Sequence, residues 1–478
     1  MSGFHIDWSQ FVGFSEWFFL AYFIAISGCY LLLNLVSIIN LKAYMPNQIL
    51  EGLPQIYSGL EPPVSILVPA YNEQTTIIAS VQSMLQLTYP TFDVIVVNDG
   101  SRDGTLDILK DTFGLLPIPE AYRERLKTNT VRAIYRSTRF PNLRVIDKDN
   151  GGKADALNAA INASRYPLIC SVDADSIIQR NSLQRITHPF MEDQRVVAVG
   201  GTVRVANGCT VEDGFLKKVG LPGNLLALFQ VVEYLRDFLF GRLGWSVLDG
   251  LLIISGTIGL FRKETVIEVG GFRTDTVGED MELVVRMHRM LRKEQKPYRM
   301  VFLPDPVSWT EAPENFQTLK MQRMRWQRGL CESLFGNLGL LFSRNGGVAG
   351  WLAFPFMLIF ECLGPMIEVT GYLFMIVFYW LDYISWQVFT IFICAAIGLG
   401  LLLSLSGLLL EEMSFHIYDR PKQVLVLLCA AVLENFGYRQ LNAWWRLMGL
   451  FHWLFNKNCD WGEMKRNGSW QKTSELET

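Results

Sequence analysis

The sequence predicts an α/β domain set between apolar segments that cross a membrane. Hydrophobic residues make up 50% of the 478 residues and charged residues only 19%, and the mean hydropathy is +0.21. Long apolar stretches lie near both ends, whereas short apolar runs alternate with helical segments between them. We therefore expect a multi-pass membrane protein with a central soluble domain.

Residues 1–45 form the predicted N-terminal anchor. Trp17 to Ile39 contains no charge, and it is long enough to cross a hydrocarbon core of about 30 Å. A secretory signal peptide is the alternative, but the first residues lack a basic region and no small-residue cleavage site follows. We therefore expect a retained transmembrane helix.

Residues 351–412 contain the predicted C-terminal spans. Tyr383 to Leu410 is free of charge and forms one span. Trp351 to Trp380 is also apolar, but Glu361 and Glu368 flank Gly364 and Pro365. A carboxylate that faces lipid is costly. We therefore expect a break there, with an interfacial half before it and a span after it.

Residues 413–456 are predicted to form an amphipathic helix in the membrane interface, because Pro421 to Phe455 carries charges among its apolar residues. A further span is the alternative. Basic residues near Lys42 and in the tail, residues 457–478, place the middle of the chain and its C-terminus in the cytoplasm by the positive-inside rule. The predicted location is therefore the plasma (inner) membrane, with three spans.

Residues 46–318 form the predicted cytoplasmic domain. Five apolar runs rich in β-branched residues predict buried strands of a parallel sheet, and helical stretches such as Thr75–Leu87 and Lys153–Ser164 lie between them. The runs are Val64–Pro69, Asp93–Val97, Leu143–Ile146, Leu168–Val172 and Val196–Val199. Ligands bind beyond the carboxyl ends of the strands in such sheets.

Polar residues follow four of these runs in order: Asn72-Glu73, Asn98–Ser101, Asp147–Lys153 and Asp173–Asp175. Each alone is an ordinary turn, but four in order predict a ligand site. Lys153 follows two glycines at a helix start, where backbone N–H groups and a cation can meet a diphosphate. A flexible turn is the alternative, and the spacing is not that of a P-loop.

Asp173 and Asp175 suit a hard divalent cation, because both supply carboxylate oxygens at one strand end. Zinc and disulfide scaffolds are not expected, since the eight cysteines are scattered without a Cys-x-x-Cys pair. The chain has 43 basic and 46 acidic residues. Nucleic acid is not an expected partner, because its phosphates require a basic surface.

Six motifs together resemble the glycosyltransferases of family two, above all the membrane-embedded polysaccharide synthases of the poly-N-acetylglucosamine, chitin-oligosaccharide, hyaluronan and cellulose type. They are Val68–Glu73, Asn98–Ser101, Asn150–Asn158, Asp173–Asp175, Gly278–Asp280 and Gln322–Trp326. The resemblance covers about residues 60–345. It implies a glycosyltransferase A-type domain with a Rossmann-like, mostly parallel sheet, joined to transmembrane and interfacial helices.

The resemblance also implies roles for these residues on the donor side. Asn72, Glu73 and Asp99 would hold the uridine of a UDP-sugar, and Lys153 would lie near its diphosphate. Asp175, with Asp173, would place Mg²⁺ or Mn²⁺ there. Asp280, beside Glu279, would be the general base, although Glu279-Asp280 could also simply cap a helix.

On the acceptor side, residues 319–350 would form an interfacial helix that carries the Gln-x-x-Arg-Trp motif. Arg325 would meet the diphosphate and Trp326 the acceptor sugar, with Gln322 beside them. A plain basic interfacial helix is the alternative. Ser255-Gly256-Thr257 resembles a loop near the acceptor terminus. Phe229–Trp245 resembles an amphipathic segment against the membrane, and both could instead be ordinary core and loop.

The tail contains Trp461 in a segment that is basic at Lys465 and Arg466 and has glycines at Gly462 and Gly468. A segment that closes over bound donor is one interpretation, and a disordered tail is the other.

Three functions are compatible with the sequence. The first is an inverting, processive β-glycosyltransferase that polymerises UDP-N-acetylglucosamine or UDP-glucose and extrudes the growing polysaccharide. The second is a transferase that adds one sugar to a membrane lipid. The third is an inactive scaffold or transporter, against which the intact acidic motifs argue.

Three spans are few for a sugar channel. We therefore expect either a second copy or accessory subunit that completes the channel, or a conduit lined by the membrane charges Glu361, Glu368, Arg439 and Arg446.

Overall fold

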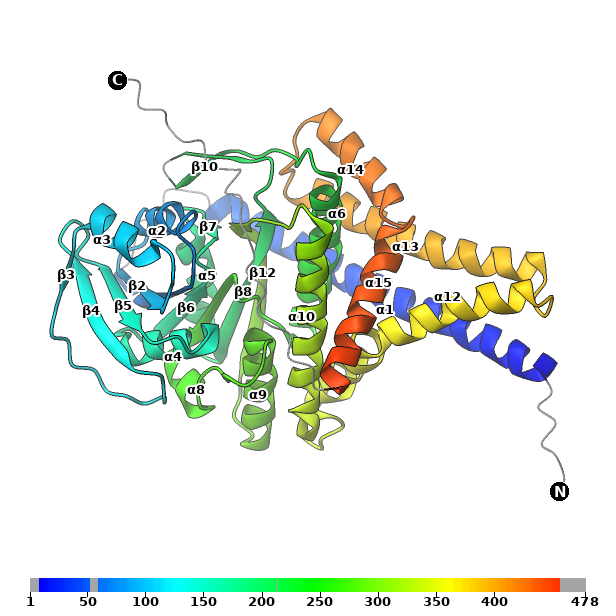
Figure 1. Cartoon of the computed structure of the whole chain (residues 1–478), viewed down its shortest axis with the longest axis horizontal. Coiled ribbons are helices and arrows are strands. Elements are labelled where there is room, and N and C mark those ends of the chain that lie inside the picture. The colour runs from blue at the N-terminus through cyan, green and yellow to red at the C-terminus, as the bar shows by residue number, and fades with distance from the viewer. Residues whose placement is uncertain (1–7, 52–58, 213, 456–478) are drawn as a thin grey trace.

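The computed structural model describes residues 8–51, 59–212 and 214–455. A sheet domain and a group of long helices lie side by side, and α1 (Trp8–Glu51), α12 (Gly364–Trp380) and α13 (Trp386–Ser414) extend away from the sheet (Figure 1). The α/β domain between apolar helices is the predicted architecture.

The main sheet has ten strands in the order β3-β4-β5-β2-β1-β6-β11-β8-β12-β7. Their bounds are β1 Val64–Ala70, β2 Phe92–Asp99, β3 Leu115–Pro117, β4 Val131–Ser137, β5 Leu143–Lys148, β6 Leu168–Val172, β7 Ile177–Ile178, β8 Val196–Val205, β11 Ile258–Arg262 and β12 Arg299–Thr310. Strands β9 (Thr210–Glu212) and β10 (Phe215–Lys218) form a separate antiparallel pair.

All five predicted runs are strands, and β5, β2, β1 and β6 are parallel neighbours. The sequence did not predict β11, which lies antiparallel between β6 and β8. Strand β4 is also antiparallel, to β5. The motif-bearing loops therefore meet at one edge of the parallel part.

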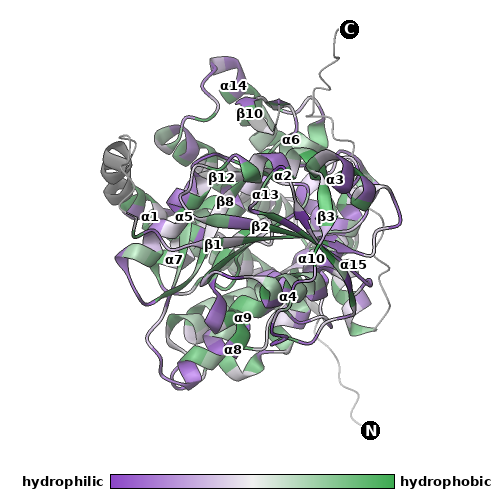
Figure 2. Cartoon of the chain, turned by 90° about the vertical axis from the view of Figure 1, so that its left-hand side faces the viewer, coloured by the Kyte–Doolittle hydropathy of each residue, from purple (hydrophilic) through white to green (hydrophobic). Residues whose placement is uncertain are grey.

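Helices cover both faces of the sheet (Figure 2). One face packs against α2 (Ile77–Leu85), α3 (Thr105–Phe113) and α5 (Ser182–Glu192). The other face packs against α4 (Lys153–Ala163), α8 (Lys263–Glu268) and α9 (Glu279–Lys293). Strands buried on both faces explain why the runs are continuously apolar.

The segment Phe229–Trp245 is helical but does not lie on the outside of the molecule. It forms parts of α6 (Leu225–Glu233), the π-helix η1 (Tyr234–Gly241) and α7 (Arg242–Val247). Leu239 and Phe240 are fully buried in the core that contains α4 and α9. The expected amphipathic membrane contact is wrong for these side chains, because α1 and α13 pack over η1.

Two described helical segments are long and apolar enough to cross a membrane: Ser9–Leu41 within α1, and α13. The segment Ala349–Cys362 and α12 form a third candidate that is bent by 42°. That segment comprises η3 (Ala349–Ala353), α11 (Phe354–Phe356) and η4 (Met357–Cys362). The predicted break before Pro365 is therefore present.

The fourth candidate corrects the prediction of one helix over Pro421–Phe455. It consists of α14 (Pro421–Leu433) and α15 (Tyr438–Leu454), bent by 58°. Gly437 has a φ of 100° and is the N-cap of α15, so the chain turns between the two helices. Glu434 is buried just before this turn and accepts hydrogen bonds from Arg236 and Ser404. Counting each bent pair as one span gives up to four spans.

The membrane charges contact protein groups. The guanidinium of Arg446 on α15 lies 2.9 Å from the carboxylate of Glu361 on η4. Arg439 donates to the side-chain oxygen of Asn435 at 3.1 Å. Such pairing explains how these charges are accommodated among apolar helices. Whether they line a sugar conduit stays a prediction.

Candidate active site

The first two motif loops interlock at the carboxyl edge of the sheet. Asn72 has a left-handed φ of 55°, and its side-chain oxygen accepts from the backbone N–H of Arg102 at 2.8 Å. Its own N–H donates to Ser101 Oγ at 3.1 Å. Glu73 accepts from Thr76 at 2.7 Å at the start of α2. These bonds fix Asn72 and Glu73 beside the end of β2.

Asp99 is buried and turned toward the third loop rather than outward. Its carboxylate accepts from the N–H groups of Gly151 and Gly152, at 3.0 and 2.7 Å. Lys148 donates to the same carboxylate at 2.6 Å and lies 2.6 Å from Asp155. The resemblance implies uridine binding by Asp99, but this geometry gives it a role in shaping the glycine loop.

Lys148 is a functional candidate that the motif analysis missed. Its side chain is fully buried between the two carboxylates. A lysine at a strand end between Asp147 and Asp149 gave only a weak signal in the sequence.

Lys153, Asp173, Glu279 and Asp280 form one cluster. The Lys153 ammonium lies 2.6 Å from Asp173 and 3.1 Å from Glu279. Asp280 accepts from the N–H of Gly256 at 3.0 Å through one oxygen and from the N–H of Met281 at 2.8 Å through the other. The structure thus joins residues that lie more than a hundred positions apart in the sequence.

The charges in this cluster influence one another. Burial opposes the charge of Lys153, but the nearby carboxylates of Asp173, Glu279 and Asp280 outweigh it and raise the lysine pKa. Burial raises the pKa of Glu279, and Lys153 opposes that shift. Lys153 therefore stays cationic where the sequence predicts a diphosphate.

The Ser255–Thr257 loop lies against the cluster. Ser255 Oγ donates to Thr257 Oγ1 at 3.2 Å. A Cβ atom on Gly256 would lie 2.6 Å from the Lys153 ammonium, so a larger residue would displace the lysine. The small-residue loop therefore adjoins the predicted catalytic carboxylate.

Asp175, two residues after Asp173 in the chain, is the other predicted metal ligand. It is buried, and Thr310 donates to its carboxylate at 3.3 Å. The side chain of Asp173 is 27% exposed to solvent. Across residues 8–51, 59–212 and 214–455, no three His, Cys, Asp or Glu side chains gather around one point as a metal site would require.

Helix α10 (Phe316–Phe335) carries the Gln-x-x-Arg-Trp motif. Gln322 is buried, Arg325 is partly buried and Trp326 is exposed. The sequence analysis missed Arg323, whose guanidinium lies 4.3 Å from the centre of the Trp326 ring and 2.7 Å from Glu233. Arg323 therefore holds the ring of Trp326, which we call the acceptor platform because the resemblance implies that it meets the acceptor sugar.

A contact between two glycines joins α10 to the start of α9. A Cβ atom on Gly329 would lie 2.8 Å from the Gly278 Cα atom. One turn further along α10, Glu332 accepts from the N–H of Val277 at 2.9 Å. The motif helix thus holds the loop that leads into Asp280.

Gly329→Ala should therefore separate α10 from that loop. We expect about 1–3 kcal/mol of lost stability from overpacking, and a loss of turnover of about 100-fold if Asp280 shifts by about 1 Å. Gly339→Ala is a matched control, because its Cβ would meet only Arg289 at 3.6 Å. Equal unfolding temperatures and turnover for the two variants would contradict the proposed contact.

Two family models match the chain. Glycosyl transferase family 2 matches residues 65–266, and glycosyl transferase family group 2 matches residues 168–404. The chain belongs to glycosyltransferase family 2. The two matches together contain the Lys153 cluster, and they confirm that this protein is a glycosyltransferase.

Similar proteins include the poly-beta-1,6-N-acetyl-D-glucosamine synthase of Staphylococcus epidermidis, 28% identical over 57% of this chain and 55% of that protein. The synthase of Staphylococcus aureus (strain COL) is 26% identical over the same shares of the two chains. The aligned part of this glycosyltransferase thus spans about half the length of these curated relatives.

A solved structure has a similar fold: a mannosyltransferase from Pyrobaculum calidifontis, in complex with GDP-Man and Mn²⁺. It has a TM-score of 0.51 and 18% identity, and the match covers 92% of this chain and 100% of that one. The glycosyltransferase A-type fold is thereby confirmed. The individual site residues stay predictions, and Trp461 lies outside the described residues.

Proposed function

We propose that this glycosyltransferase is an inverting, processive β-glycosyltransferase that polymerises a UDP-activated N-acetylhexosamine or hexose. The observation that carries the proposal is the cluster of Lys153, Asp173, Glu279 and Asp280 at the carboxyl edge of the sheet. UDP-N-acetylglucosamine is the favoured donor, because the staphylococcal relatives are named as poly-N-acetylglucosamine synthases. UDP-glucose is the alternative.

Asp280 removes the proton from the acceptor hydroxyl in this proposal. The acceptor oxygen forms its bond to the anomeric carbon while the bond from that carbon to the UDP oxygen breaks, which inverts the configuration. The N–H groups of Gly256 and Met281 orient the carboxylate of Asp280. Lys153 and Arg325 meet the negative charge that develops on the departing diphosphate.

The carboxylates fit a divalent metal ion that is completed by substrate. Mg²⁺ is commonly held by one or two carboxylates together with substrate phosphates, and Asp173 and Asp175 supply that number. Bound there, Mg²⁺ or Mn²⁺ would neutralise charge on the diphosphate.

Asp175→Ala should weaken binding of the UDP-sugar and remove the dependence of turnover on added Mg²⁺ or Mn²⁺. EDTA should likewise stop wild-type turnover, and either ion should restore it. Donor affinity measured by calorimetry with and without metal checks both statements. Full activity in EDTA would contradict the metal assignment.

The candidate spans support export of the product. Parts of α1 and α13 are long and apolar enough to cross a membrane, and the two bent helix pairs add up to two further spans. We place the protein in the plasma (inner) membrane with its catalytic domain in the cytoplasm, where UDP-sugars are made. The polysaccharide leaves between the helices that carry Glu361 and Arg446, with a second copy or accessory subunit where one chain does not suffice.

The decisive experiment incubates membranes that contain the protein with UDP-N-acetylglucosamine or UDP-glucose and sizes the product. We expect a long polymer from one donor. A single sugar on a lipid would instead support transfer to a lipid acceptor, and no product from either donor would contradict the proposed donor class.

A further inference from the structure

A basic pocket lies at the opposite edge of the sheet from the Lys153 cluster. Its volume is about 240 Å³. It lies beside the C-terminal end of α4, whose first residue is Lys153. Because α4 separates the two places, the pocket is not part of the donor site.

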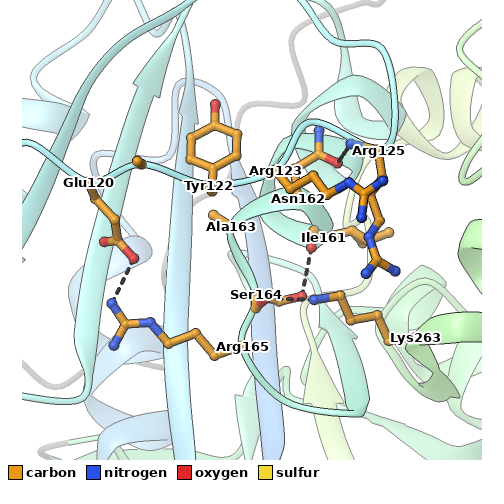
Figure 3. Close-up of a pocket in the computed structure, with 11 residues that line it drawn as sticks. Glu120, Tyr122, Arg123, Arg125, Ile161, Asn162, Ala163, Ser164, Arg165 and Lys263 are labelled. Atoms are coloured by element: carbon orange, nitrogen blue, oxygen red, sulfur yellow. Dashed lines mark hydrogen bonds and ion pairs between the residues drawn. The ribbon is translucent and has the colours of Figure 1, made fainter.

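Four cations line the pocket, with one carboxylate. Figure 3 shows Arg123, Arg125 and Lys263 on one side of it, and Arg165 with Glu120 on the other. Glu120 is already paired with two arginines, since it lies 2.7 Å from both Arg165 and the buried Arg144. The pocket therefore carries excess positive charge.

Capping of α4 accounts for only part of this charge. Cations are favoured near the C-terminal carbonyl groups of a helix. Lys263 donates to the Ser164 carbonyl at 2.6 Å, and Arg144 donates to the Ala163 carbonyl at 3.1 Å. Two cations thus serve the helix end, which leaves Arg123 and Arg125 without that role.

The loop that carries these two arginines is fixed. The buried side chain of Asn162 accepts from the N–H groups of Arg125 and Leu126, each at 3.0 Å, and donates to the Leu126 carbonyl at 2.8 Å. The nearest carboxylate to Arg125 is the exposed Glu264, at 3.7 Å. Burial and the neighbouring Arg125 lower the pKa of Lys263, as expected where like charges are crowded.

We propose that this pocket binds a phosphate-bearing anion, a second ligand site besides the catalytic one. Arginine forks and a lysine ammonium match phosphate oxygens. A soluble small molecule is the favoured ligand rather than a lipid headgroup, because α4 and α8 lie at the far end of the molecule from α12 and α13 (Figure 1). The site is independent of the proposed polymerase function.

Inorganic pyrophosphate is a suitable probe, titrated by calorimetry into the full chain in phosphatidylcholine nanodiscs. We expect Arg123→Glu/Arg125→Glu to bind one equivalent less than wild type. The control Lys293→Glu/Arg344→Glu makes the same charge change at exposed positions elsewhere and should keep the wild-type stoichiometry. Any equivalent bound at the catalytic site is common to all three proteins.

Arg123→Gln/Arg125→Gln is a milder second variant, and it should weaken the same equivalent at least tenfold. Equal stoichiometry and affinity in the pocket variants and the control would overturn the proposal. Nanodiscs of phosphatidylglycerol test the source of the phosphate. If they abolish that equivalent in wild type, the ligand is a lipid headgroup and the assignment to a soluble molecule is wrong.

Discussion

Asp280→Asn should abolish sugar transfer while leaving donor binding unchanged. The change removes the base but keeps the side-chain shape, and the amide oxygen can still accept from the Gly256 N–H. Loss of general-base help costs about 10²–10⁴-fold in rate. Turnover under saturating UDP-N-acetylglucosamine and UDP affinity by calorimetry measure the two parts separately.

Asp275→Asn is the matched control, because it makes the same chemical change five residues earlier at an exposed carboxylate paired with Arg273. It should keep wild-type turnover. Wild-type turnover in Asp280→Asn would remove Asp280 from the reaction. A parallel loss of UDP binding would instead show that the carboxylate holds the donor.

The parallel half of the sheet was predictable because its strands are buried on both faces, which makes Val64–Pro69 and its neighbours continuously apolar. Strand β11 was not predictable in this way, because Ile258–Arg262 is short and pairs with β6 and β8 from distant parts of the chain. Local pattern does not encode such long-range pairing.

The residues of the candidate active site likewise divide into those that the sequence predicts and those that it does not. Motif residues such as Lys153 and Asp280 were found by their order along the chain. Lys148 and Arg323 were missed because their importance arises from buried partners, Asp99 and Glu233. The turn at Gly437 was also missed, since an isolated glycine in a helical pattern is often tolerated.

Arg323→Met is expected to have the largest effect on stability. Arg323 is buried on α10, and Glu233 on α6 accepts hydrogen bonds from it at 2.7 Å and from Tyr438 of α15 at 2.9 Å. Removing one partner of a buried ion pair costs about 3–5 kcal/mol, because the other charge stays buried and uncompensated. The shift in the midpoint of chemical unfolding measures this loss.

The double variant Arg323→Met/Glu233→Gln should recover much of that stability. It removes both charges, and replacing a buried pair with neutral groups is often close to neutral. Lys320→Ala, on the same helix and only partly buried, should leave stability nearly unchanged. A single variant as stable as wild type would show that the pair does not hold α6, α10 and α15 together.

The same pair of variants tests whether Arg323 positions the acceptor platform. Its guanidinium supports the Trp326 ring, so both the single and the double variant should raise the KM for an oligosaccharide acceptor more than the KM for UDP-sugar. A merely structural role predicts that the double variant regains both KM values along with its stability. Recovery of the acceptor KM in the stable double variant would therefore assign Arg323 to packing alone.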